Sequence, residues 1–470
     1  MISETKLADQ LYRNYESFIE ATLQNRRFKH SEILPLINNL KNKDIFTVTK
    51  TGKSTEGRNI YLISAGTGKT KIFLWSQMHG NESTATMAIF DILNFLSSDN
   101  NFEKVKKDLL SKLTIYFMPM VNPDGAEYFQ RRNSLGIDIN RDAAKLESKE
   151  GKLLQKVFTK ISPHFGFNLH DQSTAYSAGK SFKPATISFL APPADKNRKM
   201  TPGRKKAALL IGKLYKEISA YIPGHIAKYS DEFEPRAFGD NFQKAGTSTI
   251  LIESGGWKND PEKMFIRKIN FITILTALYS ISFKSWKNEK LETYDKIPFN
   301  EELLKDIIIR NLSLVKGGKR VLVDIGLKLK EVNIRKSKSF YIKSEIEDIG
   351  DLSVFYGYED HDFNGMTVEY GKTFPKKFNS MEEIKEIDFF ALYKKGYTNV
   401  FVKKAENLEF SEFPINIIKS GEEITDNTWL EKPANLVFRK NGTTKYVMVN
   451  GFLVNVNSQT GQIMNGLVHC

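Results

Sequence analysis

The sequence predicts an α/β fold with a mixed, mostly parallel sheet and helices on both faces, followed by an all-β domain. From residue 72 to about residue 283, apolar strand-like runs alternate with helical patterns, which is typical of a sheet covered by helices. From about residue 313, short alternating strands are separated by Gly and Asn-Gly turns. The length of 470 residues also exceeds what a single core usually serves, so more than one domain is expected.

The N-terminal part is expected to open with a helical entry segment over residues 1–45, because its apolar residues recur at helical spacing. Residues 46–285 are expected to form the α/β domain, which begins with a strand pair near residues 45–49 and 60–64. Its further strands are predicted at residues 72–78, 113–121, 165–170, 186–190 and 248–253. Its helices are predicted at about residues 83–97, 151–162, 203–221 and 261–283.

The C-terminal part has a different character. Residues 286–312 are expected to be a linker with one short helix at residues 301–310. Residues 313–470 are expected to form a β-rich accessory domain, for which the sequence predicts no function. Its strands are predicted at residues 320–325, 339–342, 367–370, 399–402, 435–438 and 446–454.

The composition is that of a globular chain with dispersed positive charge. Hydrophobic residues make up 40% of it, and the net charge of +14 comes from lysines spread through every segment, so nucleic-acid binding is not expected. The one cysteine, Cys470, excludes an intrachain disulfide and a site of several thiolates. Because no apolar stretch of 18 residues occurs, we expect a cytoplasmic protein without a membrane partner. The sequence does not predict the oligomeric state.

Polar side chains follow several of the predicted strands where each strand ends. His79 and Glu82 come after residues 72–78, His170 closes the strand at residues 165–170, and Glu253 ends another strand. In α/β sheets, functional groups collect at this carboxyl edge. A catalytic zinc takes about three protein ligands and leaves one position open, and His170 is the strongest candidate for the third. His170 or Glu253 alone would more often be structural, so the series of residues carries the argument.

Arginines follow the turn Asn122-Pro123-Asp124-Gly125 at two sites, Arg131-Arg132 and Arg141. Arginine is suited to bind a carboxylate or to stabilise an oxyanion. Either one alone would more often be a surface residue. Two such residues near a metal suggest a substrate with a free carboxylate.

These residues together resemble the zinc metallocarboxypeptidases of the carboxypeptidase A type, over about residues 30–285. The matching elements are Gly52-x-Ser54-x-Glu56-Gly57-Arg58, His79-x-x-Glu82, Asn122-Pro123-Asp124-Gly125, Arg131-x-Asn133, Gly136-x-Asp138-x-Asn140-Arg141, His170 and Glu253. The resemblance implies the fold of these enzymes and one Zn²⁺ per chain.

The resemblance also implies a role for each residue around the metal. His79, Glu82 and His170 would bind the zinc. Glu253 would act as general base and general acid, and Asp138 would orient His79 through a hydrogen bond.

Other matching residues would contact the substrate. By the same resemblance, Arg131 would polarise the scissile carbonyl, and Asn140 with Arg141 would hold the terminal carboxylate. Enzymes of this family usually carry a tyrosine on a loop before the catalytic glutamate. Tyr229 is the candidate here, although the spacing leaves its placement open.

The chain departs from the family pattern around the pocket for the substrate side chain. Asp171 follows the third ligand where the digestive enzymes have a small residue. The loop before Glu253 carries Arg236 and Asp240 beside Phe238. We therefore expect a polar, unusual side-chain pocket, with Arg236 and Phe238 among the substrate-binding candidates.

The expected function is a zinc-dependent hydrolase that removes a C-terminal residue from peptides with a free C-terminal carboxylate, using water activated by the metal. A zinc-dependent deacylase of the aspartoacylase and succinylglutamate desuccinylase type is an alternative, because those enzymes resemble the carboxypeptidases in their metal ligands and in the Asp-x-Asn-Arg element. The upstream Gly-x-Ser-x-Glu-Gly-Arg element and the Asn-Pro-Asp-Gly turn favour the peptidase. A non-catalytic peptide-binding module is disfavoured because every catalytic residue is present.

Overall fold

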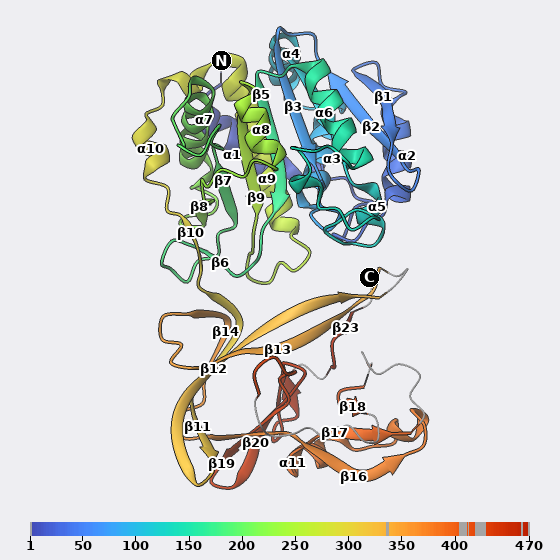
Figure 1. Ribbon diagram of the computed structural model, residues 1–470, viewed down its shortest axis with the longest axis vertical. Helices are drawn as coiled ribbons and strands as arrows, with labels where there is room; N and C mark the ends of the chain where they lie inside the picture. Colours follow the sequence, from blue (N-terminus) through green and yellow to red (C-terminus); the bar gives the residue numbers. More distant parts are fainter. Residues whose placement is uncertain are drawn as a thin grey trace. The chain divides into compact units, whose positions relative to one another are not determined.

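The computed structural model describes residues 2–334, 338–403, 411, 413–418, 429–461 and 464–468, so Cys470 lies outside the described residues. The chain forms two compact units, the first ending at Glu302 and the second beginning at Leu303 (Figure 1). We call them the N-terminal unit and the C-terminal unit. The expected entry segment belongs to the N-terminal unit, whereas the boundary between the two units falls inside the expected linker, after Glu302.

The N-terminal unit is built on an eight-stranded sheet with the strand order β1-β2-β4-β3-β5-β9-β7-β8. The four central strands, β4, β3, β5 and β9, run parallel, while β1, β2 and β7 pair antiparallel with their inner neighbours. This confirms the mixed, mostly parallel sheet. The strands are β1 Phe46–Lys53, β2 Asn59–Ala65, β3 Thr70–Ser76, β4 Leu113–Met118, β5 Phe165–Asp171, β7 Ile187–Leu190, β8 Ile226–Lys228 and β9 Ser248–Ser254.

Helices cover both faces of this sheet, as the alternation of elements predicted (Figure 1). Along β3, Ile72 and Leu74 pack into one buried cluster with helices α3, α7 and α9, whereas Phe73 and Trp75 pack into a second cluster with α6 and α8. Both faces of the central strands are therefore apolar, as a covered parallel sheet requires. The helices are α1 Glu4–Asn14, α2 His30–Leu40, α3 Thr84–Ser97, α4 Glu103–Lys112, α5 Pro123–Glu127, α6 Lys149–Ile161, α7 Pro202–Ile218, α8 Phe238–Lys244, α9 Met264–Phe283 and α10 Leu291–Asp295.

Helix α9 is apolar around most of its circumference, and its charged residues are Arg267 and Lys268. It is long and apolar enough to cross a membrane by length and composition, but 83% of that stretch is buried inside the protein. A helix that is hydrophobic all round is what the centre of a large core requires. In this chain α9 packs against α1, α3, α4 and α7.

The sheet brings the predicted site residues to one edge. His170 on β5 and Glu253 on β9 are partners in register on adjacent parallel strands, and β3 ends three residues before His79. The loop that carries His79 also approaches the turn after β4 very closely. A Cβ atom on Gly80 would lie 2.0 Å from the carbonyl carbon of Gly125, so only glycine fits there.

The C-terminal unit is rich in strands, as expected, and also contains the short helix α11 Phe389–Lys394. Its larger sheet has the order β22-β21-β20-β19-β15-β11-β12-β13-β23, with β14 paired to β11, and a smaller parallel sheet consists of β16, β17 and β18. The strands are β11 Leu304–Lys316, β12 Lys319–Asn333, β13 Phe340–Gly350, β14 Tyr356–Asp362, β15 Thr367–Tyr370, β16 Lys372–Phe378, β17 Tyr397–Val402, β18 Asn416–Ile418, β19 Leu436–Lys440, β20 Thr443–Val449, β21 Phe452–Asn455, β22 Thr460–Gly461 and β23 Leu467–Val468.

The short helix expected at residues 301–310 is wrong, because this segment forms the end of β10 Asn300–Glu302 and the start of β11. The apolar spacing fits a helix, but Ile307, Ile308 and Ile309 are β-branched and pair with strands on both sides. Pairing with β12 and β14 therefore decides the conformation.

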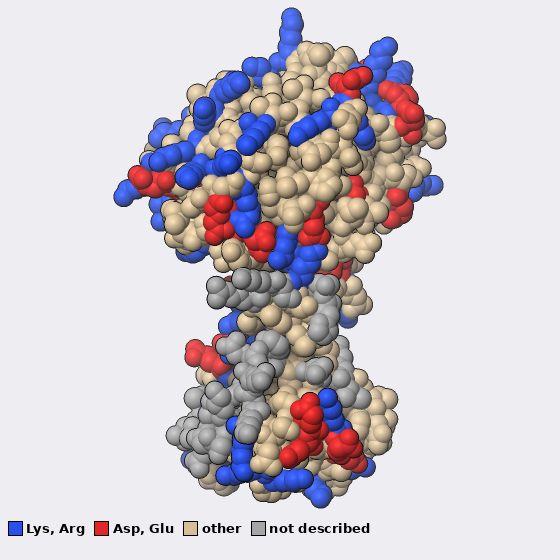
Figure 2. All heavy atoms as spheres, turned by 90° about the vertical axis from the view of Figure 1, so that its right-hand side faces the viewer, with Lys and Arg blue, Asp and Glu red and all other residues tan. Residues whose placement is uncertain are grey.

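Lysine and arginine are scattered over one face of the molecule, with aspartate and glutamate between them (Figure 2). This distribution agrees with the dispersed charge seen in the sequence.

A buried ion pair anchors the N-terminal segment to the helices of the core. Asp91 on α3 accepts hydrogen bonds from Arg267 on α9, from the Tyr15 hydroxyl at 2.8 Å and from the backbone N–H of Glu20 at 2.7 Å. The Arg267 guanidinium also donates to the carbonyl oxygens of Leu23 and Glu20. Only 1% of Arg267 is exposed, so its charge depends on Asp91 for compensation.

We predict that Asp91→Ala lowers the free energy of unfolding by about 3–5 kcal/mol, because it leaves the Arg267 charge buried and unpaired. The matched control is Asp9→Ala, which removes the partner of Arg13 in an exposed pair on α1 and should cost less than about 1 kcal/mol. Urea denaturation of the full chain measures both. Equal losses for the two variants would contradict the role of this ion pair.

Candidate metal centre

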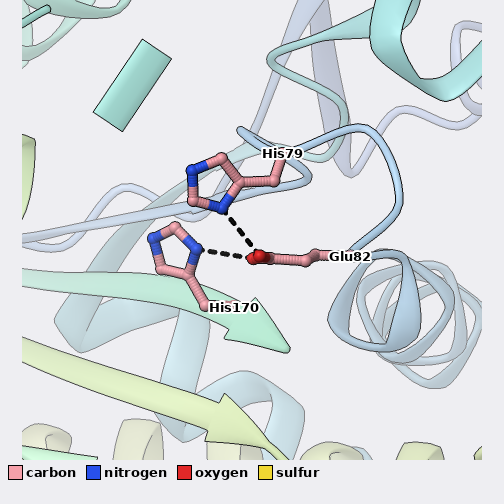
Figure 3. A group of neighbouring side chains, drawn as sticks. All are labelled: His79, Glu82 and His170. Atoms are coloured by element: carbon pink, nitrogen blue, oxygen red, sulfur yellow. Dashed lines mark hydrogen bonds and ion pairs between the residues drawn. The ribbon is translucent and has the colours of Figure 1, made fainter. Parts of the chain in front are cut away.

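Three side chains, two from the loop after β3 and one from β5, converge at the carboxyl edge of the sheet (Figure 3). The Glu82 carboxylate lies between two imidazoles, with Oε1 2.7 Å from Nδ1 of His79 and Oε2 2.7 Å from Nδ1 of His170. One ligand atom from each residue lies within 4.8 Å of the other two, and all three residues are buried. Two imidazole nitrogens and a carboxylate oxygen are the donor set of a catalytic zinc site.

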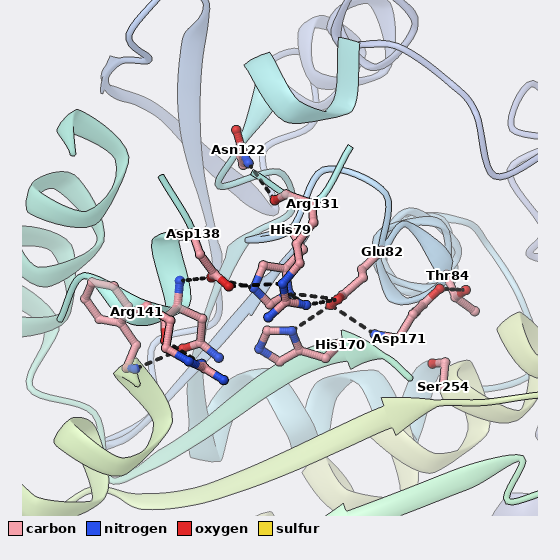
Figure 4. Close-up of polar contacts among 12 residues, drawn as sticks. His79, Glu82, Thr84, Asn122, Arg131, Asp138, Arg141, His170, Asp171 and Ser254 are labelled. Atoms are coloured by element: carbon pink, nitrogen blue, oxygen red, sulfur yellow. Dashed lines mark hydrogen bonds and ion pairs between the residues drawn. The ribbon is translucent and has the colours of Figure 1, made fainter. Parts of the chain in front are cut away.

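Neighbouring residues fix the orientation of His79 (Figure 4). Its Nε2 lies 3.0 Å from Oδ1 of Asp138, so a proton on Nε2 leaves the Nδ1 lone pair directed at Glu82. Asp138 in turn accepts from Nε of Arg131 at 3.0 Å and from the backbone N–H of Asn140 at 3.0 Å. Asp138 thus occupies the orienting position expected for it.

The electrostatics of the three residues favour a cation between them. Burial raises the pKa of Glu82, but the two imidazoles outweigh burial and hold that pKa well below its usual range. Burial lowers the pKa of His79, yet Glu82 and Asp138 reverse the effect and raise it. For His170, which also contacts Glu82, burial prevails and the pKa is lowered. The carboxylate therefore stays ionised, and His170 keeps a free lone pair.

His170 and the backbone N–H next to it are further partners of the Glu82 carboxylate. The Nε2 atom of His170 is buried and has no hydrogen-bond partner among the described residues, and the N–H of Asp171 donates to Glu82 Oε2 at 3.2 Å. Asp171 itself accepts from the Thr84 hydroxyl at 2.6 Å and pairs with Lys263 at 3.3 Å. The digestive enzymes have a small residue at the position of Asp171. The contacts with Thr84 and Lys263 explain why a carboxylate is tolerated there, beside His170.

Glu253 lies beside the three residues, across from His170 in the sheet. Burial raises the pKa of Glu253 well above its usual range, and the carboxylates of Glu82 and Asp171 raise it further. A carboxyl group in this environment binds a proton more readily than an exposed glutamate. That property suits a residue that accepts a proton and later returns it.

A pocket of about 340 Å³ opens onto these residues. Arg131, Asn140, Arg141 and Tyr229 all line it, so these predicted site residues surround one cavity together with Glu253 and the three candidate metal ligands. The volume is in the range that a small-molecule site needs.

The arginine side of the pocket is organised by Glu234. Nε of Arg141 lies 3.4 Å from Glu234, and Nη1 of Arg141 donates to its neighbour's backbone carbonyl at 2.8 Å. The carboxamide oxygen of Asn140 accepts from the backbone N–H of Phe238 at 3.0 Å. Hydrogen bonds from Arg236, and then the Arg141 charge, lower the pKa of Glu234 to about 2. The Glu234 carboxylate therefore forms an ion pair with Arg141 at the pocket.

Two predicted substrate-binding residues lie elsewhere. The Phe238 side chain is fully buried in the cluster that also contains Trp75 and Phe242, and it is not among the residues lining the pocket. Arg236 is bound to Glu234 at 2.7 Å with 55% of its side chain exposed, and it does not line the pocket either. Helix α8 begins at Phe238, which turns this ring toward the core.

Several lining residues were not anticipated as site residues from the sequence. They come from the segment after His170, from the loop before α8 and from α8 itself, and they include Gln172, Tyr176, Glu232, Glu234 and Asp240. Burial raises the pKa of Asp240 to about 7. These acidic groups confirm the expectation of a polar pocket, but no spacing in the sequence pointed to Tyr176.

A larger hollow of about 640 Å³ lies at the other end of the strands, near Thr70 and Phe165, where β3 and β5 begin. Its lining includes His164 and lysines but, among the described residues, no carboxylate. This hollow therefore has no metal-binding donor set in spite of its greater size, and the smaller pocket is the candidate site.

Comparison with known proteins gives a family for part of the chain. Residues 33–185 match the family described as Zinc carboxypeptidase. The chain is 32% identical over 142 residues to a probable carboxypeptidase 2 of Arthroderma benhamiae and 30% identical over 130 residues to carboxypeptidase E of Caenorhabditis elegans. These matches cover 28% and 23% of this chain and 26% and 28% of the relatives, so the chain spans about a quarter of the length of the curated relatives that it matches.

Among solved structures, a metallo-carboxypeptidase from Burkholderia cenocepacia is similar with a TM-score of 0.46 and 16% identity, over 55% of this chain and 70% of that one. The matched residues 33–185 contain His79, Glu82 and His170, whereas Glu253 and Tyr229 lie beyond them. The match to the zinc carboxypeptidase family over residues 33–185 agrees with the resemblance inferred from the motifs in that part of the chain.

Proposed function

We propose that this protein is a zinc-dependent metallocarboxypeptidase, which removes the C-terminal residue of a peptide that ends in a free carboxylate. One observation carries the proposal. The donor set of His79, Glu82 and His170 shares a single pocket with the partly buried Glu253 and with two arginines. The parts needed for hydrolysis and for carboxylate recognition thus occupy one cavity.

The residues divide the chemistry between them. Zinc, when bound by the two histidines and Glu82, supplies a Lewis acid that polarises an oxygen ligand and lowers the pKa of water. Glu253 accepts a proton from the attacking water and returns it to the leaving amine. Arg131 stabilises the negative charge that develops on the scissile carbonyl oxygen. The side chain of Arg131 lines the pocket and is 43% exposed, so its guanidinium is accessible to a substrate.

Asn140 and Arg141 would determine where the substrate ends. An arginine and a carboxylate form one of the stronger charge-assisted pairs, and both residues line the pocket near the metal ligands. Glu234 holds Arg141 in place by an ion pair at 3.4 Å, so a terminal carboxylate would meet a guanidinium that is already oriented. This arrangement favours exopeptidase over endopeptidase activity.

We predict that His170→Ala loses most of the bound zinc, because it removes one of three ligands. Elemental analysis of the purified protein after dialysis measures the zinc content. His164→Ala is the matched control, since His164 is exposed and its Nδ1 only accepts the Lys71 N–H. If His170→Ala keeps one zinc per chain while His164→Ala loses it, the ligand assignment is wrong.

We predict that Glu253→Gln retains zinc and fold but loses activity by about 10²–10⁴-fold, since a carboxamide cannot accept the proton from water. Release of the C-terminal residue, followed by mass spectrometry, gives the rate. Zinc content and thermal unfolding serve as controls. Turnover close to that of the wild type would remove Glu253 from the mechanism.

We predict that Arg141→Ala lowers kcat/KM for free-acid peptides by roughly 30-fold, which corresponds to about 2 kcal/mol. This is the low end for loss of a charge partner, because Arg141 is partly exposed. C-terminally amidated peptides should be affected far less. Arg236→Ala is the comparison variant, because Arg236 shares Glu234 with Arg141 but lies outside the pocket lining. Equal wild-type cleavage of free-acid and amidated peptides would exclude an exopeptidase and favour a deacylase or an endopeptidase.

A further inference from the structure

Two tyrosines from different elements meet at the rim of the pocket. Tyr176 begins the short strand β6 Tyr176–Ala178, and Tyr229 directly follows β8. Their rings pack edge to face with centroids 6.2 Å apart, and both line the pocket. Burial, and then the nearby Glu253, raise the pKa of Tyr229, so its hydroxyl remains a hydrogen-bond donor. Both strands are only three residues long and need support from neighbouring chain.

One segment at the end of the N-terminal unit supplies that support. We call residues 295–302 the exit segment, because the chain enters the C-terminal unit at the next residue. On one side, β10 pairs antiparallel with β6, and Glu302 is the direct partner of Tyr176. The pairing is extended by the N–H of Gly179, which donates to the carbonyl of Phe299 at 2.9 Å.

On the other side, the exit segment binds the residue that precedes Tyr229. The backbone N–H of Lys228 donates to the carbonyl of Pro298 at 2.6 Å, and Lys228 forms an isolated bridge with Phe299. The Lys228 ammonium donates to the carbonyl of Asp295 at 2.9 Å and lies 4.7 Å from the centroid of the Phe299 ring. Since β8 is the last strand in the order of the sheet, these contacts cover its open edge.

Side chains add further links between the exit segment and the pocket. The carboxamide of Asn300 donates to Oε1 of Gln172 at 3.1 Å, and Gln172 lines the pocket two residues after His170. Ser177 is next to Tyr176 in β6, and its hydroxyl donates to the carbonyl of Glu301 at 3.1 Å.

We propose that the exit segment positions Tyr176 and Tyr229 as a pair against the substrate, which makes Lys228 and Asn300 positioning residues for the reaction. The proposal rests on the proposed function, because a substrate-binding role for the pair needs a peptide in this pocket. It adds Tyr176 to the substrate-contacting residues and gives the segment leading into the C-terminal unit a part in substrate binding.

The kinetic test uses Lys228→Met and Asn300→Ala in the full-length, zinc-loaded protein. Each should raise KM for a peptide substrate by roughly 2- to 10-fold, the value of a lost hydrogen bond, with a smaller change in kcat. The effect of Lys228→Met should shrink when Tyr229→Phe is already present, because the two changes act on one contact. Lys296→Met is the matched control, since Lys296 is an exposed lysine of the same segment. Full additivity of Lys228→Met and Tyr229→Phe would overturn the proposal.

A second measurement reports on the tyrosines without any turnover. In protein labelled with 3-fluorotyrosine, Tyr176→Phe and Tyr229→Phe assign the two ¹⁹F resonances. Lys228→Met should shift the Tyr229 resonance and Asn300→Ala or Ser177→Ala the Tyr176 resonance, while Lys296→Met shifts neither. Unchanged resonances in all three folded variants would overturn the proposal. Shifted resonances in a protein that releases no C-terminal residue would instead contradict the proposed function and leave the placement of the tyrosines by the exit segment standing.

Discussion

The site depends on one interaction, the buried carboxylate of Glu82 between the imidazoles of His79 and His170. A buried carboxylate is costly unless charged or hydrogen-bonding partners compensate it. Here both oxygens accept hydrogen bonds, Oε1 from Nη1 of Arg131 and Oε2 from the N–H of Asp171, and Nδ1 of His79 and Nδ1 of His170 each lie 2.7 Å from one of them. The two histidines and Asp171 come from the end of a central strand or the loop after it, so the parallel sheet must be intact for the carboxylate to be compensated. Fold and site are therefore energetically linked.

The sequence predicted this edge well because the physics that creates it is local. His79, His170 and Glu253 each follow or end an apolar run, and parallel strands bring their carboxyl ends to one side of the sheet. Polar residues that follow different strands in the sequence are therefore neighbours in the structure. Asp138 was expected beside His79 only from the family resemblance. In the structure it caps a short turn, and its carboxylate lies 3.0 Å from Nε2 of His79.

The predictions that failed depended on contacts between distant segments. Residues 301–310 have the apolar spacing of a helix, and only pairing with β12 and β14 makes them extended. Phe238 lies in the loop region that forms the pocket, but as the first residue of α8 its ring turns into the core. Tyr176 belongs to the pocket because β10 pairs with β6 from more than a hundred residues away, which no local pattern encodes.

The most direct test of this account is an anomalous difference map at the zinc absorption edge from crystals of the full chain loaded with zinc. We predict one strong peak per chain, in contact with Nδ1 of His79, Nδ1 of His170 and the carboxylate of Glu82, the three groups that converge in the structure. Protein that retains zinc in solution but shows its peak away from these three groups would contradict the central claim.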